Sequence, residues 1–211
     1  MARRPRIGIT IGDPAGIGPE VALKAAASED ILAVCVPVLI GDAKYLLSWA
    51  QTFQIVGDFT VLSPGNSISS SADDLLIYSL NNLASPLLMG KEQASAGRAA
   101  GEYIETAVQL CLSQEIDAVV TAPINKSALH LGGYNFPGHT EMFSHLTDTK
   151  DFAMSFVAPN LRVALLTTHL PLTEVSAHVK KEPLAKLIRL VQRELQGLGF
   201  AQPRIAVAAL N

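Results

Sequence analysis

Apolar runs separated by glycine- and proline-marked turns predict an alternation of strands and helices along this chain. Short runs rich in β-branched residues indicate buried strands, and longer runs with apolar residues three and four positions apart indicate helices. The expected strands cover residues 6–11, 33–40, 59–62, 75–79, 116–121 and 204–210, and the expected helices cover residues 19–27, 43–54, 91–115 and 181–198. This alternation is typical of α/β proteins with a mostly parallel sheet.

Two further strand patterns, at residues 152–158 and 162–168, are separated by only three residues. A connection this short joins antiparallel neighbours, because parallel neighbours need a long crossover. We therefore expect a three-layer α/β/α fold whose mostly parallel sheet contains one antiparallel pair. We expect a first domain over residues 1–120 and the start of a second over residues 121–211.

The composition narrows the class of protein. Apolar residues make up 49% of the chain and charged residues 17%, which supports a large buried core. The net charge of −3 gives no general attraction to nucleic acid or to an anionic membrane. No apolar run reaches the about 18 residues of a membrane span, and the first strand begins without a signal-peptide core. Cys35 and Cys111 lie in apolar patterns typical of reduced, buried thiols, so we expect a cytoplasmic protein.

A glycine-rich segment, GDPAGIGPE at residues 12–20, follows the first strand and opens a helix. Its glycines lack the G-x-G-x-x-G order of a dinucleotide fingerprint, and no Gly-Lys-Ser/Thr ends it as in a phosphate loop. Its free N–H groups could face an anion or substrate oxygens. A tight turn from strand to helix explains the same glycines. Asp13, at the end of the strand, favours the functional interpretation and is a candidate catalytic residue.

Polar and cationic residues follow the strand at 116–121, first in TAPINK at residues 121–126 and then in PGHTE at residues 137–141. Ligands of open α/β sheets bind beyond the carboxyl ends of strands. Either segment alone is a turn before a capped helix. Together they favour a site, which combines Asn125, Lys126, His139, Thr140 and Glu141. Lys126 could neutralise a substrate anion or a developing oxyanion. His169 also follows a strand, and both a ligand role and a structural role remain open for it.

Four motifs occur in a specific order: GDPAGIGPE, TAPINK, PGHTE and, at residues 167–172, TTHLPL. Together they resemble the 4-hydroxythreonine-4-phosphate dehydrogenase family, PdxA. The resemblance implies a fold similar to that of isocitrate and isopropylmalate dehydrogenases, with the active site between two domains and shared across a homodimer. It also implies oxidation of 4-phosphohydroxy-L-threonine with NAD and loss of carbon dioxide. The product is 3-amino-2-oxopropyl phosphate, in pyridoxal phosphate biosynthesis.

The same resemblance assigns roles to single residues. His139 and Thr140 match the substrate-binding pair of the family, and His169 matches the first of three histidines that hold a divalent metal, either zinc or magnesium or cobalt. The other two histidines belong to the motifs PHAGE and YHDQG, which this sequence lacks. Most of the dinucleotide-binding region is also missing, so the cofactor-binding residues stay unassigned and NAD and NADP both remain possible. The chain resembles the N-terminal two-thirds of such an enzyme.

Two alternatives remain. Paralogous enzymes share these motifs and oxidise D-threonate or D-erythronate 4-phosphate, so the substrate is a small phosphorylated hydroxy acid whose identity is open. A chain without two metal ligands could instead be an inactive fragment with a binding or dimerisation role. Whichever phosphorylated acid the enzyme oxidises, the candidate catalytic residues are Lys126 and Asp13.

Overall fold

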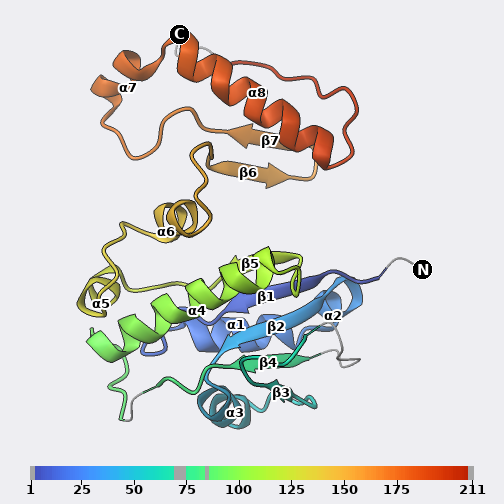
Figure 1. The fold of residues 1–211 in the computed structure, drawn as a ribbon, viewed down its shortest axis with the longest axis vertical. Coiled ribbons are helices and arrows are strands. Elements are labelled where there is room, and N and C mark those ends of the chain that lie inside the picture. The colour runs from blue at the N-terminus through green and yellow to red at the C-terminus, as the bar shows by residue number, and fades with distance from the viewer. Residues whose placement is uncertain (1–2, 69–74, 84–85, 209–211) are drawn as a thin grey trace. The chain divides into compact units, whose positions relative to one another are not determined.

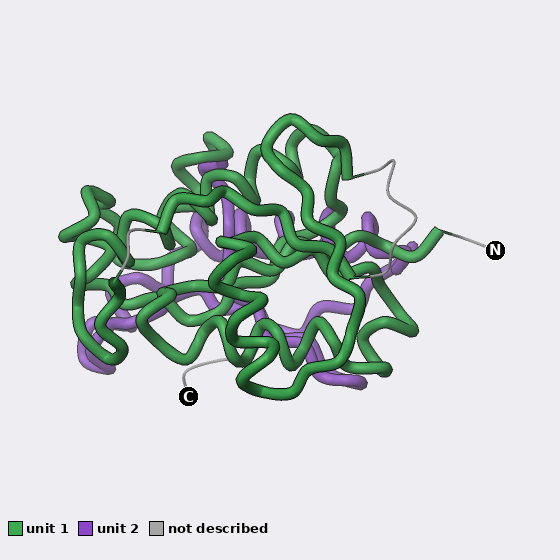
Figure 2. Tube along the Cα trace, turned by 90° about the horizontal axis from the view of Figure 1, so that it is seen from below, with its two compact units in different colours: residues 1–148 green, residues 149–211 purple. Residues whose placement is uncertain are grey.

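The computed structural model describes residues 3–68, 75–83 and 86–208 of this chain. The chain forms two compact units, residues 1–148 and residues 149–211, which are coloured green and purple in Figure 2. Within the described residues, no helix has the length and apolar character needed to cross a membrane.

A five-stranded parallel sheet forms the centre of the first unit, with strand order β3-β4-β2-β1-β5 (Figure 1). Its strands are β1 (Arg6–Thr10), β2 (Val36–Gly41), β3 (Thr60–Leu62), β4 (Leu76–Ser79) and β5 (Ala118–Thr121). Thr10 pairs in register with Ile40 of β2 and with Thr121 of β5. The carboxyl ends of β1 and β5 therefore lie side by side, and the segments that follow them begin at the same edge of the sheet.

Helices cover both faces of this sheet. The helices of this unit are α1 (Gly18–Ala26), α2 (Glu29–Val34), α3 (Ala43–Thr52), α4 (Ala94–Leu112), α5 (Lys126–Leu131) and α6 (His139–Leu146), of which α5 and α6 pack against α4. The crossover from β1 to β2 and the crossover from β4 to β5 run in opposite directions along the sheet. Because parallel crossovers are right-handed, α1 and α4 lie on opposite faces. The predicted three-layer α/β fold is confirmed, and the change of direction lies between β1 and β5.

The strand expected over residues 33–40 begins only at Val36, because α2 occupies residues 29–34. Ser28 lies at the N-cap position of α2 in an extended conformation, and Glu29 and Asp30 fill the first turn. These residue types favour a helix start, since acidic side chains are stabilised by the positive end of the helix dipole. The apolar residues of α2 therefore belong to a helix and not to the strand that follows it.

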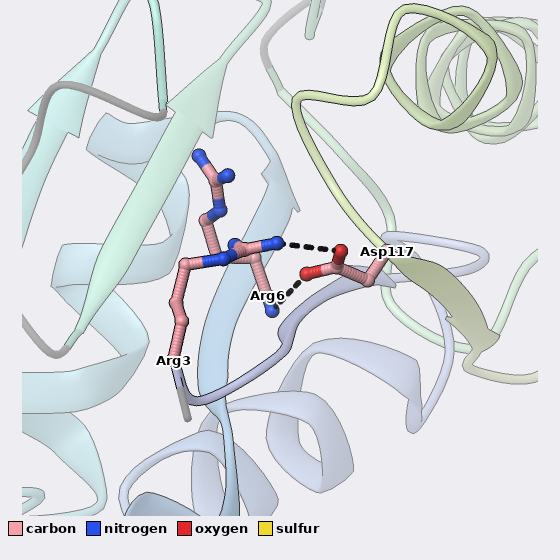
Figure 3. Close-up of polar contacts among 3 residues, drawn as sticks. All are labelled: Arg3, Arg6 and Asp117. Atoms are coloured by element: carbon pink, nitrogen blue, oxygen red, sulfur yellow. Dashed lines mark hydrogen bonds and ion pairs between the residues drawn. The ribbon is translucent and has the colours of Figure 1, made fainter. Parts of the chain in front are cut away.

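A carboxylate joins the starts of the neighbouring strands β1 and β5. Asp117 accepts hydrogen bonds from the Arg6 backbone N–H at 2.7 Å and from the Arg3 guanidinium at 2.8 Å (Figure 3). The Asp117 N–H donates in return to the Arg6 carbonyl at 2.7 Å. The backbone donor and then Arg3 hold the pKa of Asp117 below its usual range. The contact fixes β5 at the edge of the sheet.

The second unit contains the predicted antiparallel hairpin, but the expectation that this pair is part of the parallel sheet is wrong, because the two strands form a two-stranded sheet of their own. Strands β6 (Ser155–Ala158) and β7 (Leu161–Ala164) pair with Phe156 opposite Val163, and helices α7 (Leu172–His178) and α8 (Lys181–Gly197) follow. The strand expected over residues 204–210 is wrong for residues 204–208, which form no strand, and residues 209–210 lie outside the described part. A strand needs a neighbour for its backbone hydrogen bonds, and no described strand pairs with this segment. The domain boundary expected at residue 120 stays a prediction for a longer protein.

Candidate functional site

The glycine-rich segment after β1 is hydrogen-bonded to the segment after β5. The Asp13 N–H donates to the Pro123 carbonyl at 2.9 Å, and the Ala122 N–H donates to the Thr10 carbonyl at 3.0 Å. Gly12 has a φ of +69°, and a Cβ there would lie 2.2 Å from the Pro123 carbonyl oxygen. Only glycine allows this approach, so one glycine of the motif has a structural role in bringing the two segments together.

Asp13 is the buried carboxyl group of this junction, with only 5% of its surface exposed. Its Oδ1 accepts a hydrogen bond from the Ala15 N–H at 2.8 Å. Burial raises the pKa of Asp13, and the Ala15 N–H partly opposes that rise. A carboxyl group whose pKa moves toward neutrality is suited to accept or hold a proton.

Asn125 caps the helix that begins with Lys126. Its Oδ1 accepts a hydrogen bond from the Ala128 N–H at 2.9 Å, and its Nδ2 donates to Glu92 Oε1 at 3.4 Å. Lys126 is exposed, and its Cε lies 3.9 Å from the position that a Cβ of Gly138 would occupy. The structure therefore brings the Lys126 side chain to the start of α6, where the second predicted motif lies.

Helix α5 packs directly against the backbone of α4. A Cβ on Gly97 of α4 would lie 1.7 Å from the Ala128 carbonyl oxygen, and a Cβ on Gly132 would lie 2.3 Å from the Arg98 nitrogen. Tyr134 packs over Gly101 in the same way, and its hydroxyl donates to Glu105 at 2.9 Å. The small residues of α4 thus hold the helix that carries Lys126.

His139 is the first residue of α6 and is half-buried. Its ring lies 6.2 Å from the Phe143 ring, and its Nε2 is buried without a hydrogen-bond partner among the described residues. Burial lowers the pKa of His139, because the charged imidazolium is disfavoured away from water. A neutral imidazole with a free nitrogen can bind a hydroxyl group. Thr140 and Glu141, the next two residues, are exposed.

The predicted site residues are thus brought together in two pairs, the first through backbone hydrogen bonds and the second through the Lys126 side chain. Asp13 lies on the segment bonded to residues 121–126, and Lys126 reaches the start of the helix that begins with His139. Asp42, which follows β2, has a structural role, because its Oδ1 accepts the Tyr45 N–H at 3.1 Å and caps α3.

His169 lies in the second unit, where it is exposed and has a φ of +58°. Within the described ranges, no group of three or more His, Cys, Asp or Glu side chains could hold a metal ion. One imidazole does not match the three protein ligands of a catalytic zinc site. The described residues alone therefore do not fit the expected metal, and His169 as a ligand stays a prediction.

The sequence did not point to residues 88–93, which the structure places beside the glycine-rich segment. The Gly90 N–H donates to the Ala15 carbonyl at 2.8 Å, and Glu92 accepts the hydrogen bond from Asn125. The Gln93 side chain closes the loop through hydrogen bonds with both backbone groups of Leu88. The apolar pattern gave no signal for this segment, because the contact with Ala15 uses backbone groups only.

Comparison with known proteins identifies similar chains. Residues 33–211 match the sequence model of the family described as "Pyridoxal phosphate biosynthetic protein PdxA". A D-threonate 4-phosphate dehydrogenase of Cupriavidus necator is 39% identical over 98% of this chain and 62% of its own length. The crystal structure of a 4-hydroxythreonine-4-phosphate dehydrogenase from Burkholderia phymatum is 37% identical, with a TM-score of 0.89 over 100% of this chain and 64% of that one.

A more distant structure shares the fold. A terephthalate 1,2-cis-dihydrodiol dehydrogenase from Burkholderia xenovorans is 26% identical, with a TM-score of 0.68 over 95% of this chain and 60% of that one. The chain therefore spans about three-fifths of the length of these relatives.

Proposed function

The chain belongs to the PdxA family, and from that membership we propose that a protein of its relatives' full length that contains this chain is an NAD-dependent dehydrogenase. Its substrate is a small hydroxy acid phosphorylated at C4. The observation that carries the proposal is the junction of residues 12–16 with residues 121–126 at the carboxyl ends of β1 and β5. This edge is where the direction of the crossovers changes, and open α/β sheets bind ligands at such a point.

The reaction requires removal of a hydride and a proton from a secondary alcohol. Bound NAD would supply the hydride acceptor for this oxidation, and the proton of the hydroxyl group passes to a base. The ketone formed is a β-keto acid, which loses carbon dioxide, and the resulting enolate then takes up a proton. The chain's own residues are proposed to bind the substrate anion and to handle these protons.

Three residues have chemistry suited to these roles. Lys126 carries a positive charge at the start of α5 and can pair with the carboxylate or phosphate of the substrate. His139 presents a neutral imidazole that can bind the reacting hydroxyl group, with Thr140 next to it as a hydrogen-bond donor. Asp13 has a raised pKa, as a general base working near neutral pH requires.

The identity of the substrate is proposed from the relatives. The name of the Cupriavidus necator protein supports D-threonate 4-phosphate, and D-erythronate 4-phosphate is chemically equivalent at the reacting carbons. The Burkholderia phymatum structure supports 4-phosphohydroxy-L-threonine, which would place the protein in pyridoxal phosphate biosynthesis. A divalent metal held partly by His169, and a homodimer with a shared site, are proposed on the family resemblance.

The test is NADH formation by a protein of the relatives' length that contains this chain. The three phosphorylated acids are compared with unphosphorylated D-threonate, with and without a chelator. We expect NADH from at least one phosphorylated acid and little from D-threonate, because the phosphate supplies two negative charges for binding. Equal rates with and without the phosphate, or no NADH from any of the acids, would contradict the proposal.

A further inference from the structure

The loop of residues 132–138 joins two short helices that each begin with a candidate site residue (Figure 1). Helix α5 begins with Lys126, and α6 begins with His139. The chain leaves α5 at the end opposite to Lys126, about 9 Å away for a helix of six residues. It nevertheless returns to Lys126, because Lys126 Cε lies 3.9 Å from the position that a Cβ of Gly138 would occupy. The course of this loop therefore decides whether Lys126 and His139 lie together.

Hydrogen bonds fix the first half of this loop. The Gly133 N–H donates to the His130 carbonyl at 3.0 Å, and the Tyr134 N–H donates to the Leu129 carbonyl at 3.1 Å. The Tyr134 hydroxyl donates to Glu105 of α4 at 2.9 Å. These bonds end α5 and hold the chain as far as Tyr134, but they do not extend to the residues that open α6.

A histidine ties the second half of the loop to α5. The His130 Nε2 lies 3.0 Å from the Phe136 carbonyl oxygen. A carbonyl oxygen can only accept a hydrogen bond, so His130 Nε2 carries a proton and donates. His130 is exposed and lies in the last turn of α5. Its hydrogen bond therefore reaches from the far end of α5 to a residue three positions before His139.

Phe136 is also held from the other helix. The centroid of its ring lies 5.3 Å from that of the His145 ring, with the planes 45° apart, and His145 lies in the last turn of α6. Helix α6 in turn packs against α4 and buries Met142 fully. Phe136 thus contacts α5 through its carbonyl and α6 through its ring. A shift of Phe136 would therefore move the start of α6.

His139 depends on the backbone that carries it for the direction of its ring. The ring lies 6.2 Å from the Phe143 ring, and its Nε2 is buried without a hydrogen-bond partner among the described residues. No hydrogen bond of that nitrogen within the described part of the chain aims the ring at a substrate. Its direction follows from the start of α6, which the loop puts in place.

We propose that His130 is a positioning residue of the candidate site, because its hydrogen bond to the Phe136 carbonyl holds the loop that places His139 beside Lys126. His130 acts through the loop and not on the substrate. This inference rests on the proposed dehydrogenase function, which supplies the reaction that His139 serves. A histidine in the last turn of a helix could instead stabilise α5 alone, through the negative end of the helix dipole. The experiments below separate these two roles.

The hydrogen bond itself is tested in residues 1–211 by NMR of the histidine rings. Long-range ¹⁵N–¹H correlations show which nitrogen of a neutral imidazole carries the proton, and the hydrogen bond of the ring decides between the two. We expect the proton of neutral His130 on Nε2. A neutral His130 ring protonated on Nδ1 alone would overturn the proposal, because Nε2 could not donate to Phe136.

Two variants of the same chain test the effect on His139. His130→Leu removes the donor, and His130→Gln keeps an N–H group near the place of the imidazole Nε2. Both residues favour a helix more than histidine does, so a change cannot come from lost helix propensity. The ring and amide resonances of His139 should shift in His130→Leu and return towards their original positions in His130→Gln.

His178→Leu is the matched control. His178 is an exposed histidine of α7 whose Nδ1 lies 3.0 Å from the Glu174 carbonyl oxygen, so this variant removes the same kind of contact in the second unit. It should leave the His139 resonances unchanged. If His130→Leu also left them unchanged, the hydrogen bond would not position His139 and the proposal would be overturned.

A double-mutant cycle measures the effect on the reaction, as kcat/KM for NADH formation by a protein of the relatives' length. His130→Leu should lower kcat/KM about tenfold, since misplacing a binding group by 1 Å can cost about a hundredfold. His130→Gln should retain most of the activity. In a His139→Ala background, His130→Leu should have little further effect, because the residue that it positions is gone. Equal losses in both backgrounds would show that His130 only stabilises α5, and would overturn the proposal.

These outcomes are separate from the dehydrogenase proposal. No NADH from any of the acids would contradict the function, while the His139 resonances in His130→Leu would still decide whether His130 positions this ring. NADH formation that His130→Leu leaves unchanged would keep the function and overturn only the positioning role.

Discussion

Replacing Gly97 by alanine should destabilise the first unit, because a Cβ at this position collides with the backbone of α5. The added carbon would lie 1.7 Å from the Ala128 carbonyl oxygen and 2.7 Å from the Leu129 nitrogen, whereas ordinary contact begins at 3.4 Å. The obstacle is backbone, so no side-chain rotation can relieve it. Overpacking costs about 1–3 kcal/mol, and alanine returns about 1 kcal/mol of helix propensity. The net destabilisation should be up to about 2 kcal/mol, and the backbone contact places it in the upper part of that range.

The displacement should also be visible at the candidate site. Lys126 is the first residue of α5, so movement of that helix changes the approach of Lys126 to Gly138. Urea unfolding followed by circular dichroism measures the stability, and Trp49 fluorescence follows the first unit alone. Amide chemical shifts of residues 125–131 report the movement of α5.

Gly197, the last residue of α8, is the matched control. A Cβ there would meet no atom within 4 Å, so Gly197→Ala should be neutral or stabilise by up to about 1 kcal/mol. If Gly97→Ala were as stable as the unchanged chain and left the α5 resonances unshifted, the close packing of α4 against α5 would be refuted.

Three further changes test the contacts around the sheet. Asn125→Ala should cost about 1 kcal/mol in urea unfolding because α5 loses its cap, and Asn125→Asp should retain most of the stability. Asp117, whose pKa is lowered, contributes stability above about pH 4 that is lost as the pH falls through its folded pKa. Asp117→Asn should therefore lower the free energy of unfolding by up to about 1 kcal/mol at neutral pH. It should also reduce the loss of stability with falling pH below about pH 4, and an unchanged pH dependence would contradict the contact. The pKa of His139, measured by NMR, should be lower than in a peptide of residues 136–142. The stability of the fold should therefore decline as the pH falls below about 6.5. An equal or higher pKa would show that the ring is not buried.

Local patterns were sufficient to predict most strands and the hairpin. Residues 155–164 pair as expected because the short connection between two apolar runs leaves few alternatives. Residues 29–34 were harder, since their apolar residues suit a strand as well as a helix. The signals for the helix are Ser28 at the N-cap position and the two acidic residues that follow it. The expected strand at 204–210 depends on a partner elsewhere in the chain, and an apolar pattern cannot supply information about a partner.

The same distinction applies to the candidate site. The closeness of Asp13 and residues 121–126 was predictable, because the carboxyl ends of neighbouring parallel strands meet at one edge of the sheet. The closeness of residues 88–90 to the glycine-rich segment was not predictable, because it depends on the hydrogen bond from the Gly90 N–H to the Ala15 carbonyl. Any residue except proline could donate this bond, so the sequence carries no signal for it.

A substrate site at the carboxyl ends of β1 and β5 is tested most directly by kcat/KM for NADH formation in a protein of the relatives' length that carries Lys126→Met. With the best phosphorylated acid as substrate, this variant should lose about a hundredfold in kcat/KM, because it removes a positive charge from the place where substrate charge is bound. Lys44→Met, which removes an exposed lysine from α3, is the control and should retain the unchanged rate. A Lys126→Met protein as active as the Lys44→Met control would show that the substrate binds elsewhere.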